Sequence, residues 1–266
     1  MKTSTWRTIR AAGLVLMLVG ASVFVAGQQA EAAHALTFQP GDVFVAVGSS
    51  SVQWRETDGT LHSTLTCTSA TSTFTTGMAF DSANNLYVTM FDGNDVCKFD
   101  TGGNDIGTFG GPYSGSTESI VFNAAGEVYV GAVDGDNDIR HFDAAGNPIN
   151  DGDVAGTNRF NVATQNRGSD WIDLDCDQCT MLYTSEGNRI LRYDVCTGTQ
   201  LADFVTSASG LLNGPAFALR IIPSGPLAGQ VLVADSVNVK RKTLLETRFS
   251  QPMMHRQTFQ RIPGSH

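Results

Sequence analysis

One pattern recurs four times along this sequence, and it restricts the possible folds more than any other feature of the chain. Each copy has a short apolar strand, a polar turn and a second strand that ends in an aromatic residue. The copies lie at residues 41–60, 84–103, 126–146 and 179–198. The aromatic residues are Trp54, Phe99, Phe142 and Tyr193, at spacings of 45, 43 and 51 residues. Such a period is typical of folds built from stacked supersecondary units.

Further apolar segments flank each copy. Candidate strands precede the second, third and fourth copies at residues 77–81, 119–123 and 171–175, and others follow the turns, as at 105–109. Residues 86–91 are largely apolar on both alternating faces, which fits a strand packed between two neighbouring sheets. Four short strands per period of about 45 residues predict an all-β fold, a β-propeller of four-stranded antiparallel blades. One blade cannot bury both of its faces, so we expect the blades to stack around an axis.

Two of the copies resemble a known repeat. The segments LYVTMFDGNDVCKFD (86–100) and VYVGAVDGDNDIRHFD (128–143) look like the core of the NHL repeat. The strand ending in an aromatic residue and Asp is also similar to the six-bladed β-propellers of the gluconolactonase-like group. The resemblance covers about residues 40–235. It implies a ring of about six blades and, for the gluconolactonase-like members, a metal-dependent lactonase in which a Glu on the loop into the innermost strand binds the metal.

The repeats are too few for a ring of that size. The first copy begins at its second strand, near Val43, as is common in such propellers; three full blades follow, and then strands at 218–222 and 231–235. The pattern stops after Val239, so we expect about four to five blades in residues 36–239 and an incomplete ring. Residues 240–266 are basic, match no repeat and are expected to be disordered or irregular. A truncated or frame-shifted reading frame would produce such a tail, and a natural tail that docks on the open face or on a partner is the alternative.

The N-terminus has the order of a secretory signal peptide. Three basic residues precede an uncharged apolar run at 11–27, and small residues follow it. We therefore expect residues 1–35 to be a signal peptide that is cleaved after Ala32 or Ala35. The alternative is an uncleaved membrane anchor, for which the run is at the short limit. Cleavage predicts a secreted or periplasmic protein with no stable membrane span.

The charge is unevenly distributed along the chain. The formal net charge is −9, and residues 36–239 hold 8 basic and 24 acidic side chains. Nucleic acid is not expected as a partner, because phosphate binding needs a basic surface. The partner is instead expected to be a protein or small-molecule ligand of unknown identity. An open propeller also leaves an apolar blade face uncovered, which predicts self-association.

Five cysteines follow the expected signal peptide. Cys179 begins one strand and Cys196 ends the next, so the two lie at facing ends of an antiparallel hairpin and we expect a disulfide between them. Two free buried thiols are the alternative. Cys176 and Cys179 form a C-x-x-C pair, but a redox or metal role has little support without a second pair or a nearby His. Cys67 and Cys97 can pair across adjacent blades, although no geometric argument from the sequence establishes it.

Two sets of acidic residues are candidates for binding metal. Asp134, Asp136 and Asp138 have a spacing that calcium can use, but the run lacks the Gly and Glu of an EF-hand loop, and an exposed acidic turn is the favoured interpretation. Glu118 and Asp170 lie on loops that lead into innermost strands. Glu118 matches the metal-binding Glu of gluconolactonase-like propellers by its position in the blade only. No cofactor is therefore predicted, with a divalent metal such as calcium as the alternative.

Every recurring residue can be assigned to packing or to turns, which favours a non-catalytic binding or scaffold module. Catalysis is left open but not favoured: only His62 and His141 lie in the body of the chain, and the sequence has no G-x-S-x-G, P-loop or H-E-x-x-H motif. The alternatives are a metal-dependent lactonase-like enzyme that uses Glu118 and Asp170, and a truncated gene product without independent activity. Fold alone does not decide between them.

Overall fold

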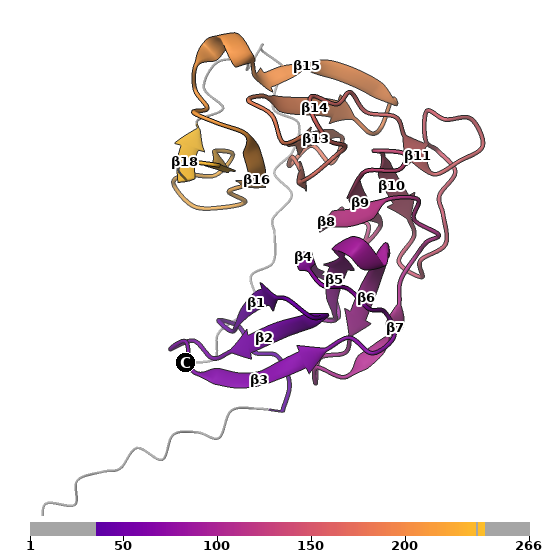
Figure 1. Ribbon diagram of the computed structural model, residues 1–266, viewed down its shortest axis with the longest axis vertical. Helices are drawn as coiled ribbons and strands as arrows, with labels where there is room; N and C mark the ends of the chain where they lie inside the picture. Colours follow the sequence, from indigo (N-terminus) through magenta and orange to yellow (C-terminus); the bar gives the residue numbers. More distant parts are fainter. Residues whose placement is uncertain (1–35, 238, 243–266) are drawn as a thin grey trace, which may run out of the picture. The chain divides into compact units, whose positions relative to one another are not determined.

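Five antiparallel sheets follow one another along the chain (Figure 1). The computed structural model describes residues 36–237 and 239–242, so the expected signal peptide and most of the basic tail lie outside the described residues. Within that part of the chain the helices are two short 3-10 turns, η1 (Phe91–Gly93) and η2 (Ser207–Ser209). No helix among the described residues has the length and apolar character needed to cross a membrane.

The sheets have three or four strands each, and we number them blades 1 to 5 in chain order. Blade 1 contains β1 (Val43–Val47), β2 (Ser51–Arg55) and β3 (Leu61–Thr66). Blade 2 contains β4 (Thr75–Phe80), β5 (Leu86–Met90), β6 (Asp95–Phe99) and β7 (Asp105–Thr108). Blade 3 contains β8 (Ser116–Phe122), β9 (Val128–Val133), β10 (Ile139–Phe142) and β11 (Arg159–Phe160). Blade 4 contains β12 (Ile172–Leu174), β13 (Thr180–Tyr183), β14 (Ile190–Asp194) and β15 (Thr199–Val205). Blade 5 contains β16 (Ala216–Ile221), β17 (Val231–Asp235) and β18 (Val239–Lys242).

Neighbouring blades touch through their innermost strands. Strand β8 contacts β4 on one side and β12 on the other, and β12 in turn contacts β16. Each full blade runs outward from its first strand to its fourth in simple up-and-down order. These features confirm the predicted all-β fold of four-stranded propeller blades, and the described sheets form no closed ring.

The first and last blades each have three described strands. Blade 1 begins at the equivalent of a second strand, as the sequence predicted. The prediction that the repeat stops at Val239 was wrong at its boundary, because the backbone of Val239–Lys242 pairs with Val231–Ala234 to form β18. This strand has no aromatic or turn signature. Its pairing depends on the free main-chain edge of β17, which any extended segment can satisfy.

Apolar side chains are buried between successive blades, as β5 illustrates. All five of its residues are buried. Val88 packs with Val52 and Trp54 of blade 1, whereas Tyr87 packs with Ile120 of blade 3. Because each fully buried large apolar side chain contributes about 1.5–3 kcal/mol, most of the stability lies at blade interfaces rather than inside single sheets.

The aromatic residue and Asp that end the third strand have separate tasks. The four aromatic residues of the repeat are buried in the blade interfaces. The following Asp holds the turn: Oδ1 of Asp100 accepts hydrogen bonds from the backbone N–H groups of Gly102 and Asn104, both at 2.9 Å. Asp143 does the same for Ala145 and Asn147. Hydrogen bonds from the side chains of Asn104 and Asn147, together with these backbone hydrogen bonds, lower the pKa of both carboxyl groups. The motif is therefore a packing and Asx-turn element.

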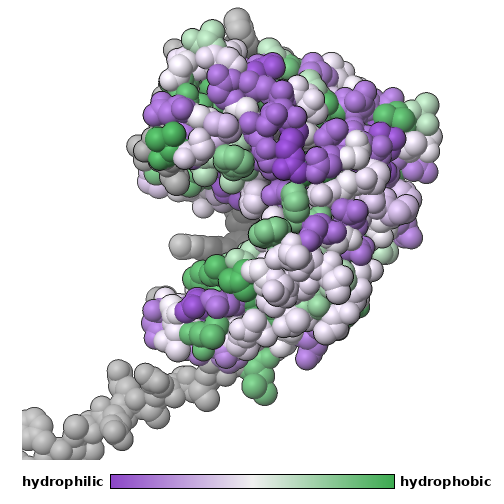
Figure 2. All heavy atoms as spheres, in the orientation of Figure 1, coloured by the Kyte–Doolittle hydropathy of each residue, from purple (hydrophilic) through white to green (hydrophobic). Residues whose placement is uncertain are grey.

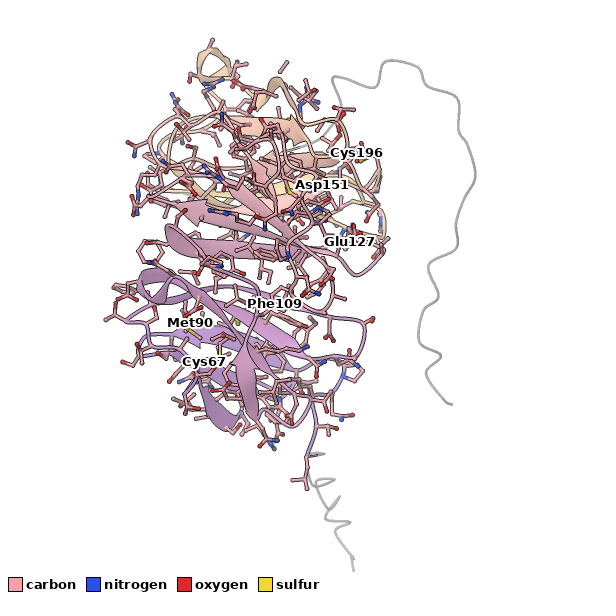
Figure 3. The ribbon with its side chains drawn as sticks, turned by 90° about the vertical axis from the view of Figure 1, so that its right-hand side faces the viewer. Cys67, Met90, Phe109, Glu127, Asp151 and Cys196 are labelled. Carbon is pink, nitrogen blue, oxygen red and sulfur yellow. A yellow bond between two sulfur atoms is a disulfide. The ribbon has the colours of Figure 1, made fainter. Side chains whose placement is uncertain are left out.

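Two disulfides are present, and Figure 3 marks one cysteine of each. Cys179 and Cys196 are bonded as predicted, with Cα atoms 5.2 Å apart. Cys67 and Cys97 are also bonded, with Cα atoms 6.2 Å apart, and they join blade 1 to blade 2. Cys176 is free and exposed. The C-x-x-C pair is thus divided between a disulfide and a free thiol.

Candidate functional site

Buried hydroxyl groups join each blade to the one before it at the entry of the innermost strand. Oγ1 of Thr117 lies 2.6 Å from the carbonyl oxygen of Asp95 and 3.2 Å from that of Met90, at the two ends of the β5–β6 turn. Thr75 in blade 2 and Ser169 in blade 4 occupy the same place and reach the equivalent carbonyl groups of the preceding blade. All three are buried. In blade 5 this place is taken by Ala216, whose backbone N–H donates to the carbonyl of Gly187.

In blades 2, 3 and 5, an irregularity in the strand displaces the residue after the anchor position. The pairing register shifts between Thr117 and Ser119, so that Glu118 is an extra residue in β8. Similar shifts occur in β4 and β16. A β-bulge of this kind bends the strand and re-aims a side chain. Asp170 takes the corresponding place in blade 4, just before β12. Blades 2 to 5 thus each present one residue at this position, namely Thr76, Glu118, Asp170 and Phe217.

These four positions line one cavity of about 650 Å³. Its wall is completed by Phe74, Phe91, Trp171, Arg167 and Glu186, together with backbone neighbours of the four. The volume lies in the range that holds a small-molecule ligand. The lining combines large aromatic surfaces with three carboxyl groups and one guanidinium group, which is the mixture of apolar surface and few polar groups that ligand pockets show.

The cavity raises the pKa of two carboxyl groups. Burial raises the pKa of Glu118 to about 8, and the charge of Asp170 adds to the shift, while Arg167 opposes it. Burial also raises the pKa of Asp170 to about 7, with a further contribution from Glu186. Asp170 is 2% exposed. Near neutral pH, both groups are therefore close to the point at which they exchange a proton.

Arg167 forms its ion pairs with residues other than Glu118 and Asp170. Its guanidinium forms ion pairs with Asp134 at 2.6 Å and with Glu186 at 3.1 Å. It also lies over the ring of Phe91, 5.6 Å from the centroid. Within the described residues, the side chain of Glu118 makes no hydrogen bond or ion pair. The cavity therefore has an excess of negative charge when its carboxyl groups are ionised.

The structure brings the two sequence-predicted metal candidates together. Glu118 and Asp170 come from adjacent blades and line the same cavity. Among the described residues, however, no third potential ligand side chain joins them in a compact group. The groups that do form contain Cys67 with Cys97 and Cys179 with Cys196, whose sulfur atoms are used in disulfides. Metal binding at Glu118 and Asp170 stays a prediction.

The three aspartates of the acidic run after β9 form ion pairs with arginines. Asp134 pairs with Arg167, Asp136 with Arg140 at 2.5 Å, and Asp138 with Arg159 at 2.6 Å. Asp138 is buried. The expectation of an exposed acidic turn was therefore wrong for this residue, because its partner Arg159 lies on β11, 21 residues further along the chain, and the local sequence does not reveal that pairing.

Sequence reasoning missed the anchors, the bulges and the aromatic wall. A signal for the first two was present: the pairs Thr75-Thr76, Thr117-Glu118 and Ser169-Asp170 stand at or just before the start of β4, β8 and β12. An alignment of the starts of the innermost strands, rather than of the second and third strands, shows the hydroxyl residue and the cavity-lining residue after it. No such signal marks Phe91. It lies in η1, on the turn after β5, and the sequence of this segment looks like that of an ordinary exposed hairpin turn.

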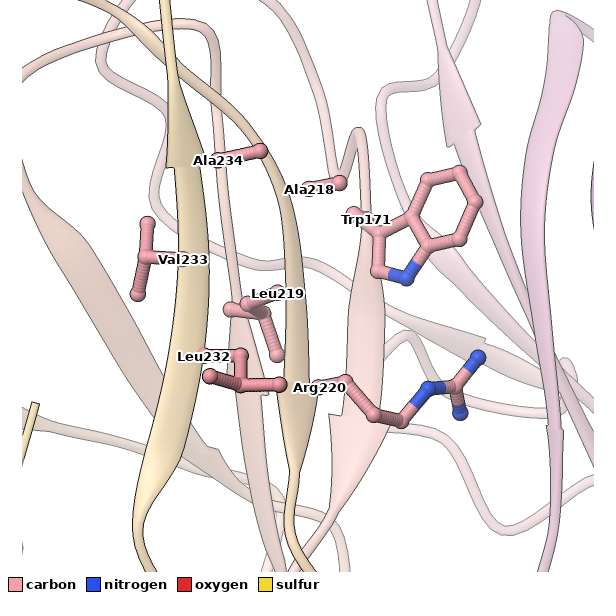
Figure 4. A pocket seen from close by; sticks show the side chains of 7 residues that line it. All are labelled: Trp171, Ala218, Leu219, Arg220, Leu232, Val233 and Ala234. Atoms are coloured by element: carbon pink, nitrogen blue, oxygen red, sulfur yellow. The ribbon is translucent and has the colours of Figure 1, made fainter. Parts of the chain in front are cut away.

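A second hollow adjoins the first. It has a volume of about 200 Å³ and lies against β16 and β17 (Figure 4). Trp171 and Ala218 line both spaces, and Leu219, Leu232 and Arg220 line the second one alone. Few polar atoms face this hollow, so it extends the apolar side of the cavity toward blade 5.

Comparison with known proteins agrees with this architecture. No family model matches the chain, and no curated protein is similar to it in sequence. Among solved structures, it is similar to the crystal structure of the WD40 beta propeller domain of Doa1, with a TM-score of 0.57 and 14% sequence identity. The match covers 77% of this chain and 60% of that one, so this chain spans less than two thirds of its structural neighbour. The protein is a β-propeller, and the likeness extends to the fold alone.

Proposed function

We propose that this protein is an exported, NHL-like β-propeller that acts as a non-catalytic binding module, and that its ligand enters the cavity between the innermost strands. The observation that carries the proposal is the ring of equivalent positions, Thr76, Glu118, Asp170 and Phe217. Main-chain pairing and buried hydroxyl groups hold the framework around them, and all four residues line the cavity. Two disulfides support an oxidising compartment.

A fragment screen by NMR on the isotopically labelled full chain tests this function. We expect fragments that bind to shift the signals of Glu118, Asp170 and Trp171 together. The double variant Thr76→Ala, Phe217→Ala should lose these shifts while its remaining spectrum stays folded. Fragments that bind only elsewhere, or none that bind, would contradict a binding module centred on this cavity.

A metal-dependent lactonase-like enzyme is the second candidate, and the observation in its favour is that Glu118 and Asp170 share one cavity. The test is metal analysis of the protein after chelation and reloading with calcium, with lactone hydrolysis measured in parallel. A tightly held ion that is lost in Glu118→Ala, together with turnover, would establish the enzyme and defeat the binding module. Hydrolysis that is unchanged by chelation and by Glu118→Ala would exclude it.

A further inference from the structure

The side chains that line the cavity indicate the charge of its ligand, and this inference rests on the proposed binding function. We propose that the cavity selects small organic ammonium ions that combine an N–H donor group with an aromatic or aliphatic body. The argument rests on three features of the lining: two carboxyl groups without ion pairs, acceptor atoms open to a ligand, and aromatic walls.

The first feature is charge. Glu118, Asp170 and Glu186 line the cavity with Arg167 as the single basic side chain among its described lining residues. Arg167 already pairs with Glu186 and with Asp134 outside the cavity. When ionised, Glu118 and Asp170 would therefore offer an incoming cation two carboxylates that form no ion pair with a described residue, in a partly buried place where electrostatic attraction is strong. A carboxylate or phosphate ligand would be repelled.

The second feature is the state of the acceptor atoms. The side chain of Asp170 is almost fully buried, and among the described residues its hydrogen bond comes from Thr184 to Oδ2 at 3.2 Å. Oδ1 has no such donor in that part of the chain. Oδ1 is therefore available to accept a hydrogen bond from a ligand in the cavity. An alkylammonium group has three donors, enough for Asp170 and Glu118 together.

The third feature is the aromatic wall. Phe74 and Phe217 are 61% and 44% exposed although both are large apolar residues. Phe91 and Trp171 face the same space. Aromatic faces attract cations, and the guanidinium of Arg167 over Phe91 shows that one ring here already does so. The walls also take the apolar body of a ligand, which a bare metal ion would leave exposed.

Calorimetric titration of the full chain at pH 8.5 with four matched probes tests the inference. The probes are 2-phenylethylamine, its N,N,N-trimethyl analogue, 2-phenylethanol and 3-phenylpropanoate, which share the ring and differ in charge and donors. We expect 2-phenylethylamine to bind at least about tenfold more tightly than the alcohol and the trimethyl analogue, as for a hydrogen bond to a charged group. We expect no binding of 3-phenylpropanoate.

Matched variants locate the effect. Glu118→Gln and Asp170→Asn keep the shape of each side chain and should each weaken binding of the amine about tenfold or more, with little change for the alcohol. Glu127→Gln, an acidic residue outside the cavity, is the control and should bind like the parent. Retained alcohol binding shows that the variants are folded.

The outcomes separate this inference from the proposed function. Equal binding of amine, alcohol and carboxylate in the cavity would overturn the ammonium selectivity and leave the binding module intact. Equal binding of the amine and its trimethyl analogue would overturn the requirement for N–H donors. Failure of all four probes would overturn the selectivity, and the fragment screen then decides the binding function by itself.

Discussion

The carboxyl groups of Glu118 and Asp170 enter one cavity from the innermost strands of adjacent blades, and the charge of Asp170 helps to keep Glu118 protonated. Neither residue is near the other in sequence. The stacking of blades 3 and 4 therefore creates an electrostatic coupling that neither blade has alone.

Glu118 makes folding stability depend on pH. The unfolded carboxyl group loses its proton near its ordinary pKa of 4.5, whereas the folded one does so at about 8. Between these values the folded state holds a proton that the unfolded state has lost, so this residue lowers stability as pH rises through that window, and the loss is complete above about 8. Below 4.5 it has no effect. Glu118→Gln should be more stable than the parent by about 2–4 kcal/mol at pH 9 and equal to it at pH 4.5 or below.

Urea denaturation of both proteins at pH 4.5 and pH 9 measures this difference. A stability gap that is the same at the two pH values would contradict the assignment. Asp170→Asn provides a second measurement, because the pKa of Asp170 is raised to about 7 and its contribution has the same sign.

Thr117→Val removes the hydroxyl that joins blade 3 to blade 2. The valine has the same shape, but the carbonyl groups of Met90 and Asp95 lose a donor in a buried place. We expect a loss of about 1–3 kcal/mol in the free energy of unfolding. Thr108→Val on the exposed side of β7 is the control and should change stability by less than about 0.5 kcal/mol. Equal effects of the two substitutions would show that the anchor contributes little.

The disulfides should each stabilise the fold. They close loops with separations of 30 and 17 residues, for which the chain-entropy relation gives about 3–4 kcal/mol each. Cys67→Ser with Cys97→Ser, and separately Cys179→Ser with Cys196→Ser, should lower the urea midpoint by corresponding amounts. Cys176→Ser should have little effect, and thiol titration of the denatured, unreduced parent should find one thiol. Three or more thiols would contradict the pairing.

Export predicts a defined mature N-terminus. The protein recovered from the periplasm or the medium of a secreting host should begin at Ala33 or Leu36, which intact-mass measurement can establish. A chain that stays in the membrane fraction with its N-terminus intact would favour the uncleaved anchor.

Exposed apolar residues on the first and last blades predict self-association. Val43 and Val45 of β1 and Leu232 of β17 are exposed, and apolar side chains form patches among polar ones on the face shown in Figure 2. We expect the mass measured by light scattering to rise with concentration and Leu232→Lys to reduce this rise. Constant monomer mass at high concentration would contradict the prediction.

The sequence revealed those parts of the fold that local packing determines. The buried aromatic residue and the turn-holding Asp act within one hairpin, so Phe99 and Asp100 could be interpreted from a few neighbouring positions. Strand β18 could not, because its pairing depends on the main-chain edge of β17 rather than on its side chains. The ion pairs of Asp138 and the position of Phe91 were also out of reach, since each depends on how one element meets another that is distant in sequence.

The bulges at the start of β4, β8 and β16 each displace one residue from the regular strand pairing. Main-chain pairing and a neighbouring anchor hold each strand, and blades 2 to 5 place a hydroxyl, two acids and a phenyl ring at equivalent points. In a scaffold of this kind, a single substitution at one of these positions changes the chemistry of the cavity lining and leaves the strand pairing of the blade in place.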